Sequence, residues 1–315
     1  MAKKSSASKE ISKALSLLGD KGFTASTYPE VEVIPTDIEA LNHVVFGCGG
    51  LPRGRVLEIY APPSVGKSTF CYWLIGQVQK RGGICVLWDA EGTYSPEYGA
   101  ACGINNDNLI MPEFGLGNEI LFQIKKLLAS NTVDFMVIDS VPSLQPEMSS
   151  ESKEDKDPNM REKLERATML SQFFTDLSGG YTIRTAKASK KFIECPVVGG
   201  RNHKLRNKKT CLAFINHAKD KIGVMFGDPT TTPGGKGLKF ASSIRIGMEE
   251  STMSKDKDDF GRPSYRVSRV KAAKNKLAPP FGTIKMKMLR EGGVKIFGDD
   301  VEVEYDSDQA FDDIE

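Results

Sequence analysis

Short runs of apolar residues alternate with longer amphipathic stretches along this chain from Arg55 onward. The runs contain few polar positions, as is typical of strands buried on both faces of a sheet, whereas the stretches between them repeat apolar residues at helical spacing. Strands that alternate with helices predict βαβ units and a mostly parallel, twisted sheet flanked by helices, an α/β fold. The expected elements are, in chain order, the strand RVLEIY from Arg55, a helix from Ser68, the strand ICVLWD from Ile84, a helix over Gly117 to Ser130, the strand VDFMVIDS from Val133 and a helix over Met160 to Leu177.

The last third of the chain follows a different pattern. After CLAFINH from Cys211 and a loop rich in Gly and Thr, four runs alternate apolar and polar residues without helical stretches between them: SIRIGM, SYRVSRV, GTIKMKML and VKIF. Neighbouring runs of this kind predict that the sheet ends in antiparallel strands.

The first residues predict a separate arm. Apolar residues at helical spacing, with Ser8 as N-cap and Gly19 as the stop, predict a helix over 8–19 and then an extended connector to Val33. A short helix does not bury its apolar face alone, so we expect it to dock on this subunit or a neighbouring one. The expected parts are a docking arm at 1–33, a core at 34–298 with a basic insertion at 178–210, and an acidic tail at 299–315.

Charge is segregated along the chain. The formal net charge is +2, but the tail at 299–315 holds nine acidic side chains and no Lys or Arg, so the rest of the chain is basic. The insertion has nine Lys or Arg residues between Arg184 and Lys209 against one acid, Glu194. Two interpretations stay open for each segment. The insertion is either a solvated loop or a nucleic-acid contact, and the tail either aids solubility or competes for a polyanion site.

The six cysteines show no CxxC spacing and lie mostly in apolar surroundings, as expected of reduced thiols in an intracellular protein. Cys195, His203, Cys211 and His217 are too loosely spaced to favour zinc. The N-terminus lacks the apolar segment of a secretory signal, and no apolar run is long enough to span a membrane. We therefore expect neither secretion nor membrane insertion.

The most specific chemical signal is RVLEIYAPPSVGKS, a strand that leads into a phosphate-binding loop and then a helix. Backbone N–H groups of such a loop surround nucleotide phosphates, Lys67 adds a charge, and Ser68 supplies a hydroxyl to Mg²⁺. Ala61 replaces the first glycine of the usual GxxxxGK[ST] pattern, but the spacing is kept. The expected nucleotide-binding residues are Ala61, Pro62, Pro63, Ser64, Val65, Gly66, Lys67, Ser68 and Thr69.

Two carboxylates follow apolar strands. The run FMVID ends in Asp139, and the carboxyl ends of strands in an open α/β sheet are where ligands bind, so Asp139 is expected to share Mg²⁺ with Ser68. Glu91 lies in LWDAEGTYSPEY, where a carboxylate can polarise the water that attacks a γ-phosphate. From the residues alone, Glu91 can also be a surface acid that caps a turn, and it is the family resemblance given next that favours the catalytic interpretation.

These segments resemble, in the same order, the motifs of the RecA family of homologous-recombination ATPases. GCGGLPRGRVLEIYAPPSVGKST resembles the family's strand and phosphate loop, DAEGTYSPEY its catalytic-glutamate segment, and FMVIDSVPSL its Walker B strand. FINHAKDKIGVMFGDPTTTPGGKGLKFASSIRI resembles the sensor strand, the second DNA-binding loop and the next helix, and KAAKNKLAPPF resembles the segment that reaches a neighbour's ATP. The resemblance covers 34–297 and implies a RecA-type P-loop ATPase core.

The resemblance implies roles for individual residues. Glu91 would be the catalytic base, Tyr98 would stack near the adenine, and His217 would stand where bacterial members carry a glutamine that senses the γ-phosphate. Lys67 would act within its own subunit, whereas Lys274 and Lys276 would reach the γ-phosphate of a neighbour. The resemblance implies a first DNA-binding loop at about 147–165 and a second at 218–235, with these DNA-binding residues: Arg161, Arg166, Lys219, Lys221, Met225, Phe226, Gly234 and Gly235. The basic insertion is not part of the resemblance, and its charge alone makes Lys204, Arg206, Lys208 and Lys209 the expected contacts if it binds nucleic acid.

The implied function is an ATP-dependent DNA recombinase that forms helical filaments on single-stranded DNA and exchanges it with a homologous duplex. ATP and Mg²⁺ are the implied cofactors, and single-strand-binding and mediator proteins the implied further partners. His217 and the missing globular C-terminal domain make the chain similar to phage-encoded, UvsX-like members, so the expected location is the cytoplasm of a bacterium or a phage-infected host.

Two alternatives stay open beside this function. Ala61 and His217 leave room for a RecA-like accessory or mediator protein that binds ATP with weak turnover. A hexameric helicase with the same core is disfavoured by the segments KNK and FINHAKDKIGVMFG.

Overall fold

The computed structural model describes residues 2–19, 24–27, 30–113, 115–147, 158–179, 207–220, 230–257 and 260–296 of the 315-residue chain. The chain divides into two units, Met1–Glu32 and Val33–Glu315. The acidic tail, most of the basic insertion and parts of both implied DNA-binding loops, 148–157 and 221–229, lie outside the described residues. The predicted DNA-binding residues among them are Lys204, Arg206, Lys221, Met225 and Phe226.

The first unit contains helix α1 (Ala2–Leu18). The helix begins at Ala2 rather than after Ser8, so the predicted N-cap is wrong, because the Ala and Lys residues before Ser8 favour helix. It ends before Gly19, whose φ of +57° matches the predicted stop. The side chains of Ile11, Leu17 and Leu18 are exposed on this helix, and their docking on another subunit stays a prediction.

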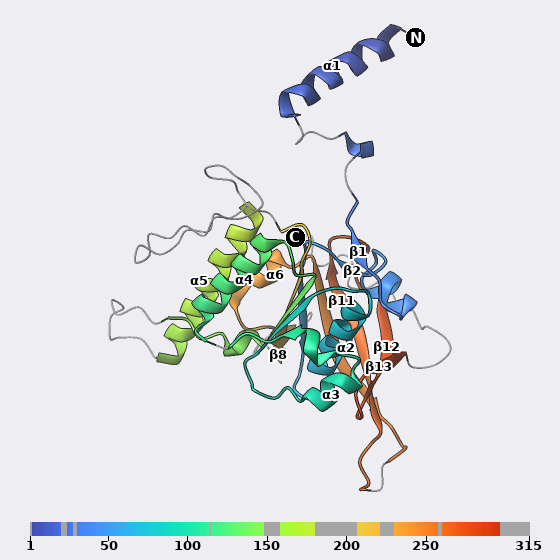
Figure 1. The fold of residues 1–315 in the computed structure, drawn as a ribbon, viewed down its shortest axis with the longest axis vertical. Helices are drawn as coiled ribbons and strands as arrows, with labels where there is room; N and C mark the ends of the chain where they lie inside the picture. The colour runs from blue at the N-terminus through green and yellow to red at the C-terminus, as the bar shows by residue number, and fades with distance from the viewer. Residues whose placement is uncertain are drawn as a thin grey trace. The chain divides into compact units, whose positions relative to one another are not determined.

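The described part of the second unit is built on a nine-stranded sheet (Figure 1). In spatial order the strands are β13 (Val294–Ile296), β12 (Thr283–Leu289), β11 (Tyr265–Asn275), β10 (Ile244–Met253), β3 (Val56–Ala61), β7 (Cys211–His217), β6 (Phe135–Asp139), β4 (Cys85–Asp89) and β5 (Leu109–Ile110). Neighbours from β10 to β5 are parallel and neighbours from β13 to β10 are antiparallel, which confirms the predicted mixed sheet.

Two short antiparallel ladders lie outside this sheet. Strand β1 (Val33–Ile34) pairs with β2 (Leu51–Pro52) just before the core sheet begins. Strand β8 (Lys219–Asp220) pairs with β9 (Thr230–Thr231) at the base of the segment that resembles the second DNA-binding loop.

Helices cover both faces of the sheet (Figure 1). The helices α2 (Lys67–Lys80) and α3 (Pro96–Ala101) lie on one side, and α4 (Gly117–Ser130), α5 (Pro158–Gly179) and α6 (Gly235–Ala241) lie on the other. Alternate residues of a central strand enter the two cores: Phe135 packs in the core that contains α2, and Met136 packs in the core that contains α4 and α5. Burial on both faces explains why β6 reads as a continuous apolar run.

The parallel strands place their carboxyl ends at one edge of the sheet. Ala61 is paired with His217, and Asp89 is paired with Asp139, each at the end of its strand. The fold therefore brings the phosphate loop, the two strand-terminal aspartates and His217 to the edge where open α/β sheets bind ligands.

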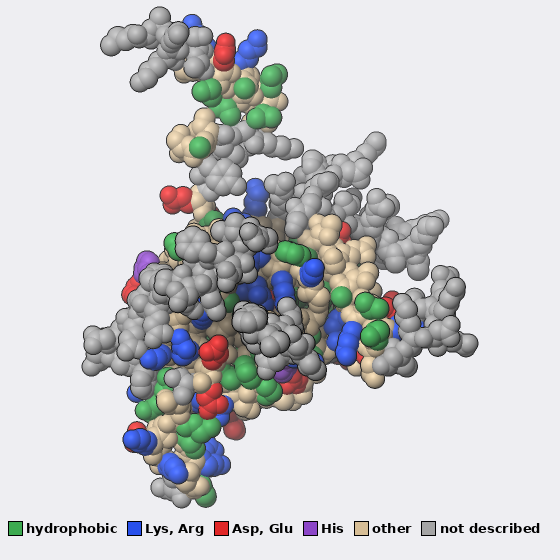
Figure 2. All heavy atoms as spheres, turned by 180° about the vertical axis from the view of Figure 1, so that it is seen from behind, with side chains coloured by type: hydrophobic (Ala, Val, Ile, Leu, Met, Phe, Trp, Pro, Cys, Tyr) green, Lys and Arg blue, Asp and Glu red, His purple; other side chains and the backbone are tan. Residues whose placement is uncertain are grey.

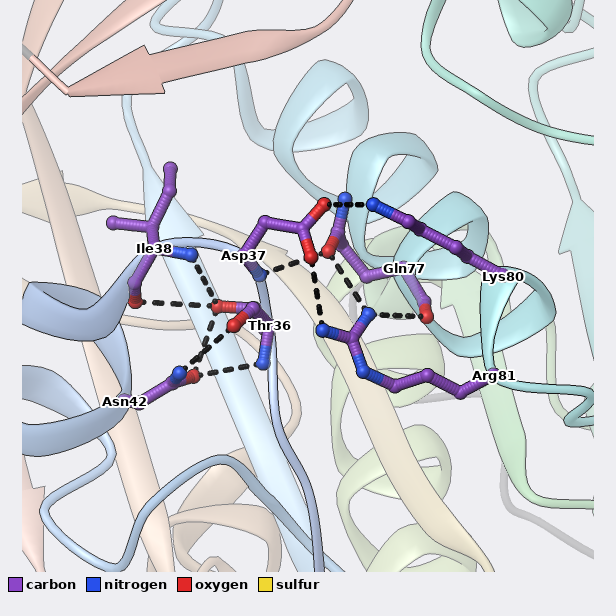
Figure 3. Close-up of polar contacts among 7 residues, drawn as sticks. All are labelled: Thr36, Asp37, Ile38, Asn42, Gln77, Lys80 and Arg81. Atoms are coloured by element: carbon purple, nitrogen blue, oxygen red, sulfur yellow. Dashed lines mark hydrogen bonds and ion pairs between the residues drawn. The ribbon is translucent and has the colours of Figure 1, made fainter.

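A polar cluster links the segment after β1 to the end of α2 (Figure 3). Asp37 accepts hydrogen bonds from Lys80 (2.7 Å) and Arg81 (2.9 Å), and its backbone N–H donates to Gln77 Oε1 (2.9 Å). Hydrogen bonds from Lys80 and Arg81 lower the pKa of the Asp37 carboxyl below its usual 3.8. Because the Asp37 side chain is 43% exposed, water screens these ion pairs.

A second aspartate with similar partners is buried. Asp134, whose side chain is 8% exposed, accepts hydrogen bonds from Arg53 Nη1 (2.6 Å) and the backbone N–H of Ile84 (3.0 Å), and lies 3.5 Å from Lys209 Nζ. Burial raises the pKa of Asp134, but these hydrogen bonds outweigh it, so the net shift is downward. Asp134 thereby fastens three chain segments at the base of β4 and β6.

We expect Asp134→Asn to destabilise the protein by about 2 kcal/mol at pH 7, because it leaves Arg53 without its carboxylate partner. The control Asp37→Asn should cost at most about 1 kcal/mol, since its pairs are exposed. Since the folded pKa of Asp134 is depressed, its contribution is present above the unfolded value near 3.8 and is lost as the pH falls through the folded value. Urea unfolding should show that the free energies of unfolding of the wild type and Asp134→Asn differ at pH 7 and converge at low pH. A constant difference across this range would contradict the assignment.

Candidate active site

The predicted phosphate loop joins the end of β3 to the start of α2. The helix begins at Lys67 rather than Ser68, with Gly66 as its N-cap at φ +105°. A Cβ built on Gly66 would lie 2.8 Å from Cγ of Met288, so both the backbone conformation and the neighbouring strand require glycine. Ser64 also has a positive φ of +63°. Left-handed positions in such a loop aim successive N–H groups at a common point, so its shape suits an anion.

Lys67 is almost fully buried, and its ammonium lies against the loop. Nζ donates hydrogen bonds to the carbonyl oxygens of Pro62 (2.8 Å) and Ala61 (3.1 Å). Burial lowers the pKa of Lys67, while Asp139 and Glu91 act in the opposite direction. A desolvated ammonium interacts strongly with an anion, so this position suits a phosphate.

The other loop residues divide between surface and core. Pro62, Pro63 and Ser64 are exposed, whereas Val65 is buried beneath them. The Val65 carbonyl accepts a hydrogen bond of 2.8 Å from Ser268 on β11. The loop is therefore held by a strand that lies far from it in the sequence.

Ser68 and Asp139 form the oxygen pair that was expected to share a metal ion. The Ser68 hydroxyl donates a 2.7 Å hydrogen bond to Asp139 Oδ2. Burial raises the pKa of Asp139 to about 6, and Glu91 and Asp89 add to this effect, while the Ser68 hydrogen bond and Lys67 oppose it. A hydroxyl and a carboxylate are hard oxygen ligands, and a cation beside them would favour the ionised form, so the donor set fits Mg²⁺.

A third carboxylate at this edge was missed in the sequence. Asp89 ends β4 beside Asp139, and its Oδ2 accepts a 2.7 Å hydrogen bond from the Tyr94 backbone N–H. Its Oδ1 is buried without a hydrogen-bond partner. An apolar strand that ends in an acid is the signal that identified Asp139, and ICVLWD carries it as well. Asp89 therefore offers a further oxygen toward the same site.

Glu91 and His217 meet beside this pair. Glu91 Oε1 lies 3.3 Å from the Ser140 hydroxyl and 3.8 Å from His217 Nε2. The Glu91 side chain is 46% exposed, so solvent reaches it. Burial and the nearby Lys67 lower the pKa of His217, and Glu91 raises it. The geometry brings the predicted base and the predicted sensor residue together at the sheet edge that carries the phosphate loop.

Tyr98 lines a cavity of about 290 Å³ beside the loop. Its hydroxyl lies 2.8 Å from Thr69 Oγ1, and its ring makes an edge contact with Tyr72. Residues Ser64, Gly66 and Thr69 form the side of the cavity nearest the loop. The other lining residues come from the C-terminal strands and their connections: Met253, Pro263, Tyr265, Arg266, Met288, Leu289 and Arg290. The cavity opens next to the phosphate loop, where a nucleoside attached to bound phosphates would lie.

A buried polar network links the sensor strand to the second loop. Asn216 on β7 donates hydrogen bonds of 2.9 Å to Glu58 and to the carbonyl of Pro233, and accepts one from the His217 backbone N–H. Glu58 in turn accepts a 2.6 Å hydrogen bond from Arg245. Glu58 is fully buried, and a single acid inside the apolar run RVLEIY is the signal in the sequence that points to such a buried network.

The ammonium groups of Lys274 and Lys276 lie at the C-terminal end of α6. The Lys274 ammonium donates to the carbonyls of Lys239 and Phe240, and the Lys276 ammonium donates to Phe240 (2.8 Å). Cations in this position complement the C-terminus of a helix. Burial, together with Lys276 and Arg245, lowers the pKa of Lys274 to about 8.

Asn275 fixes the backbone between the two lysines. Its side-chain amide donates to the carbonyls of Val45 (3.2 Å) and Phe46 (3.0 Å), and its oxygen accepts from the N–H groups of Leu277 and Ala278. The two ammonium groups are thus presented from a rigid turn.

Helices α5 and α6 bring the ends of the two predicted DNA loops together. A Cβ on Gly235 would lie 2.9 Å from the Ala167 Cβ, and one on Gly234 would lie 3.0 Å from Leu170. Both glycines have positive φ, +93° at Gly234 and +74° at Gly235. Lys219, at the base of the second loop, and Lys208 are exposed. Arg161 is half-buried and pairs with Glu165 at 3.3 Å.

Two of the predicted DNA contacts are placed differently from the expectation. Arg166 is buried, and its guanidinium donates to the Leu144 carbonyl (2.8 Å) and to Glu162. Lys209 donates to the Thr132 carbonyl (3.0 Å) and lies beside Asp134. In this conformation both side chains hold the fold together, because their charges are already matched by internal acceptors.

The described residues contain no group of three or more His, Cys, Asp or Glu side chains that could hold a metal ion by themselves, and Cys195 and His203 lie outside them. Their five cysteines are unpaired, and all but Cys48 are buried. None of the helices in the described part of the chain is long and apolar enough to cross a membrane.

Comparison with known proteins agrees with the geometry. The family model of the RecA N-terminal domain matches residues 6–195 and 200–295. The chain is 36% identical to Protein RecA of Chloroflexus aurantiacus over 281 residues, which cover 89% of this chain and 70% of that protein. It is 35% identical to Protein RecA of Chlorobaculum tepidum over 296 residues, 93% of this chain and 75% of that protein. The chain therefore belongs to the RecA family of DNA-dependent ATPases, which act in homologous recombination and repair.

Proposed function

We propose that this RecA-family ATPase forms helical filaments on single-stranded DNA and catalyses homologous pairing and strand exchange. The observation that carries the proposal is the 2.7 Å contact between Ser68 and Asp139 beside Lys67 and Glu91, at the same sheet edge as the phosphate loop. An accessory protein without turnover would have no need to keep all four groups together.

The loop and Lys67 bind the phosphates of ATP. Backbone N–H groups of the loop and the N-terminus of α2 supply the donors, and Lys67 adds a positive charge whose attraction to phosphate is strong because the ammonium is buried. The residues that would hold Mg²⁺ are Ser68 and Asp139, with Asp89 beside them. The ion, when bound, neutralises negative charge on the β- and γ-phosphates. Tyr98 lines the cavity that takes the nucleoside.

Glu91 orients and deprotonates the attacking water. Its carboxylate is half-exposed and is positioned by the Ser140 hydroxyl, so it is open to solvent on one side and fixed on the other. His217 lies between Glu91 and the second loop, and we assign it the γ-phosphate contact.

DNA binding is coupled to this chemistry through the strand that carries His217. Asn216 holds the Pro233 carbonyl just before Gly234 and α6, so a movement of the end of β7 is transmitted to the second loop. Lys219 lies at the base of that loop, and the basic insertion supplies further phosphate contacts, Lys208 among them.

Filament formation requires head-to-tail contacts between subunits. We assign the arm at 1–33 to docking on a neighbour, the core at 34–298 to ATP and DNA, and Lys274 and Lys276 to the γ-phosphate of the next subunit. We further propose that the protein acts in the cytoplasm of a bacterium or a phage-infected host, with single-strand-binding and mediator proteins as further partners.

Replacing Glu91 by glutamine tests this function. We expect kcat for ATP hydrolysis to fall by about 10²–10⁴-fold, with ATP affinity kept, because only proton handling at the water is lost. Filaments on single-stranded DNA should still form, as seen by electron microscopy with ATP. The control Glu97→Gln, in the exposed first turn of α3, should hydrolyse ATP normally.

Two results would count against the proposal. A loss of ATP affinity in Glu91→Gln would make Glu91 a structural residue. A wild-type chain that binds ATP yet forms neither filaments nor exchanged strands would be an accessory protein.

A further inference from the structure

The phosphate loop contains a backbone position that needs support. Ser64 has a φ of +63°, a conformation that residues other than glycine rarely adopt and that persists only when the surroundings fix it. The same conformation turns the following N–H groups toward the phosphates. Whatever holds Ser64 in place therefore also aims the binding groups of the loop.

Strand β11 supplies this support from a distant part of the chain. The guanidinium of Arg266 donates a hydrogen bond to the carbonyl of Ser64, 202 positions away in sequence. Two residues further along the strand, Ser268 donates to the carbonyl of Val65 at 2.8 Å. Residues two apart on a strand face the same side, so Arg266 and Ser268 form a pair of donors directed at consecutive loop carbonyls.

Glu250 on β10 orients Arg266. Its Oε2 lies 3.2 Å from Arg266 Nη1, and the Arg266 side chain is only 26% exposed. The pairing of β10 with β11 shifts register between Glu250 and Thr252. A bulge of this kind changes the direction in which side chains point and is common beside functional sites. The shift occurs where the Glu250 carboxylate meets the guanidinium.

The end of this hairpin does not suggest a docking surface. It projects from the sheet (Figure 1), and the view from behind shows basic, acidic and hydrophobic side chains intermixed on it (Figure 2). Its base is the informative part, because Met253, Pro263, Tyr265 and Arg266 all line the cavity beside the phosphate loop.

We propose that Arg266, held by Glu250, is a positioning residue that fixes the strained turn at Ser64 and so keeps the phosphate loop in its phosphate-binding shape. The inference rests on the proposed nucleotide site. It assigns the bulged β10–β11 hairpin a role in ATP binding that neither the loop motif nor the strand pattern predicts.

The test compares ATP with inorganic tripolyphosphate as ligands, both with Mg²⁺. In Arg266→Ala we expect the dissociation constants of both ligands to rise by about tenfold, because the loop that binds the shared phosphates loses its support. The kcat at saturating ATP should change much less, because Arg266 contacts Ser64 and Glu250 and makes no hydrogen bond to Glu91. Arg266→Lys keeps a charged donor and should recover most of the affinity.

Two further variants control for folding and charge. Glu250→Gln should lower the affinity for both ligands as well, but by a smaller factor. Because this variant keeps Arg266, it can still test the inference if Arg266→Ala does not fold. Arg269→Ala removes an equal charge from the same strand, where Arg269 lies 3.9 Å from Glu249, and should bind both ligands as the wild type does.

The outcomes separate the inference from the proposed function. Wild-type protein that binds neither ligand would defeat the nucleotide site itself. Normal wild-type binding with unchanged affinity in Arg266→Ala, or in Glu250→Gln if only that variant folds, would overturn the positioning role. A loss confined to ATP, with tripolyphosphate unaffected, would also overturn it, because Arg266 would then contact the nucleoside rather than support the loop.

Discussion

Lys67→Ala is expected to lower DNA-stimulated ATP hydrolysis by at least about 10²-fold, because it removes the desolvated ammonium from the phosphate loop. Burial lowers the pKa of Lys67, so the fold gains little from its charge, and the variant should remain folded. The effect should appear both in ATP affinity and in turnover, since the ammonium contacts phosphate in the ground state and in the transition state.

The measurement needs a matched control on the same helix. Lys80 ends α2 and is 63% exposed, so Lys80→Ala removes the same charge from the protein surface. Its hydrolysis rate should match the wild type, and thermal unfolding should show that both variants are folded. If Lys67→Ala hydrolyses ATP at the wild-type rate, the loop does not bind the reacting phosphates.

Most of the fold could be predicted because its central strands are buried on both faces. Strand β6 packs Phe135 against one core and Met136 against the other, so its sequence is continuously apolar and easily recognised. Helix α4 was placed correctly from its single apolar face. The antiparallel end of the sheet followed from runs without intervening helices.

Short elements escaped prediction because local preference hardly distinguishes them from loops. Helix α3 is a single short helix that depends on the Ser95 side chain, which accepts a hydrogen bond from the Tyr98 backbone N–H. Strand β5 pairs over only two residues. The start of α1 was set too late, because a serine that can cap a helix can also lie inside one.

The candidate site shows the same division. Lys67, Ser68 and Asp139 follow from spacing, because the loop length and the strand ends fix where they meet. The buried position of Arg166 could not be read from sequence, since a basic residue on a helix is usually solvated. The role of Arg266 could not be predicted either, because only the order of strands in the folded sheet brings it next to Ser64.

The lysines of the KNK segment give the most decisive test of how subunits cooperate. We expect the double variant Lys274→Ala with Lys276→Ala to bind ATP but to lose DNA-stimulated hydrolysis, because the next subunit's γ-phosphate loses its cationic partners. In their own subunit both ammonium groups donate to carbonyls at the end of α6, so the change also removes favourable contacts there. A loss of activity alone therefore does not separate action within a subunit from action between subunits.

Mixing two inactive variants, Lys67→Ala and the double variant, distinguishes action within a subunit from action between subunits. Lys67→Ala subunits keep intact lysines, and the double variant keeps an intact loop, so a joint that combines the two is complete. In a random equal mixture about a quarter of head-to-tail joints have this order, and about a quarter of wild-type hydrolysis should return. A triple variant that lacks Lys67, Lys274 and Lys276 should restore nothing when mixed with the double variant. If co-assembly is demonstrated and the first mixture still fails to hydrolyse ATP, the lysines act only as the cap of α6 in their own chain.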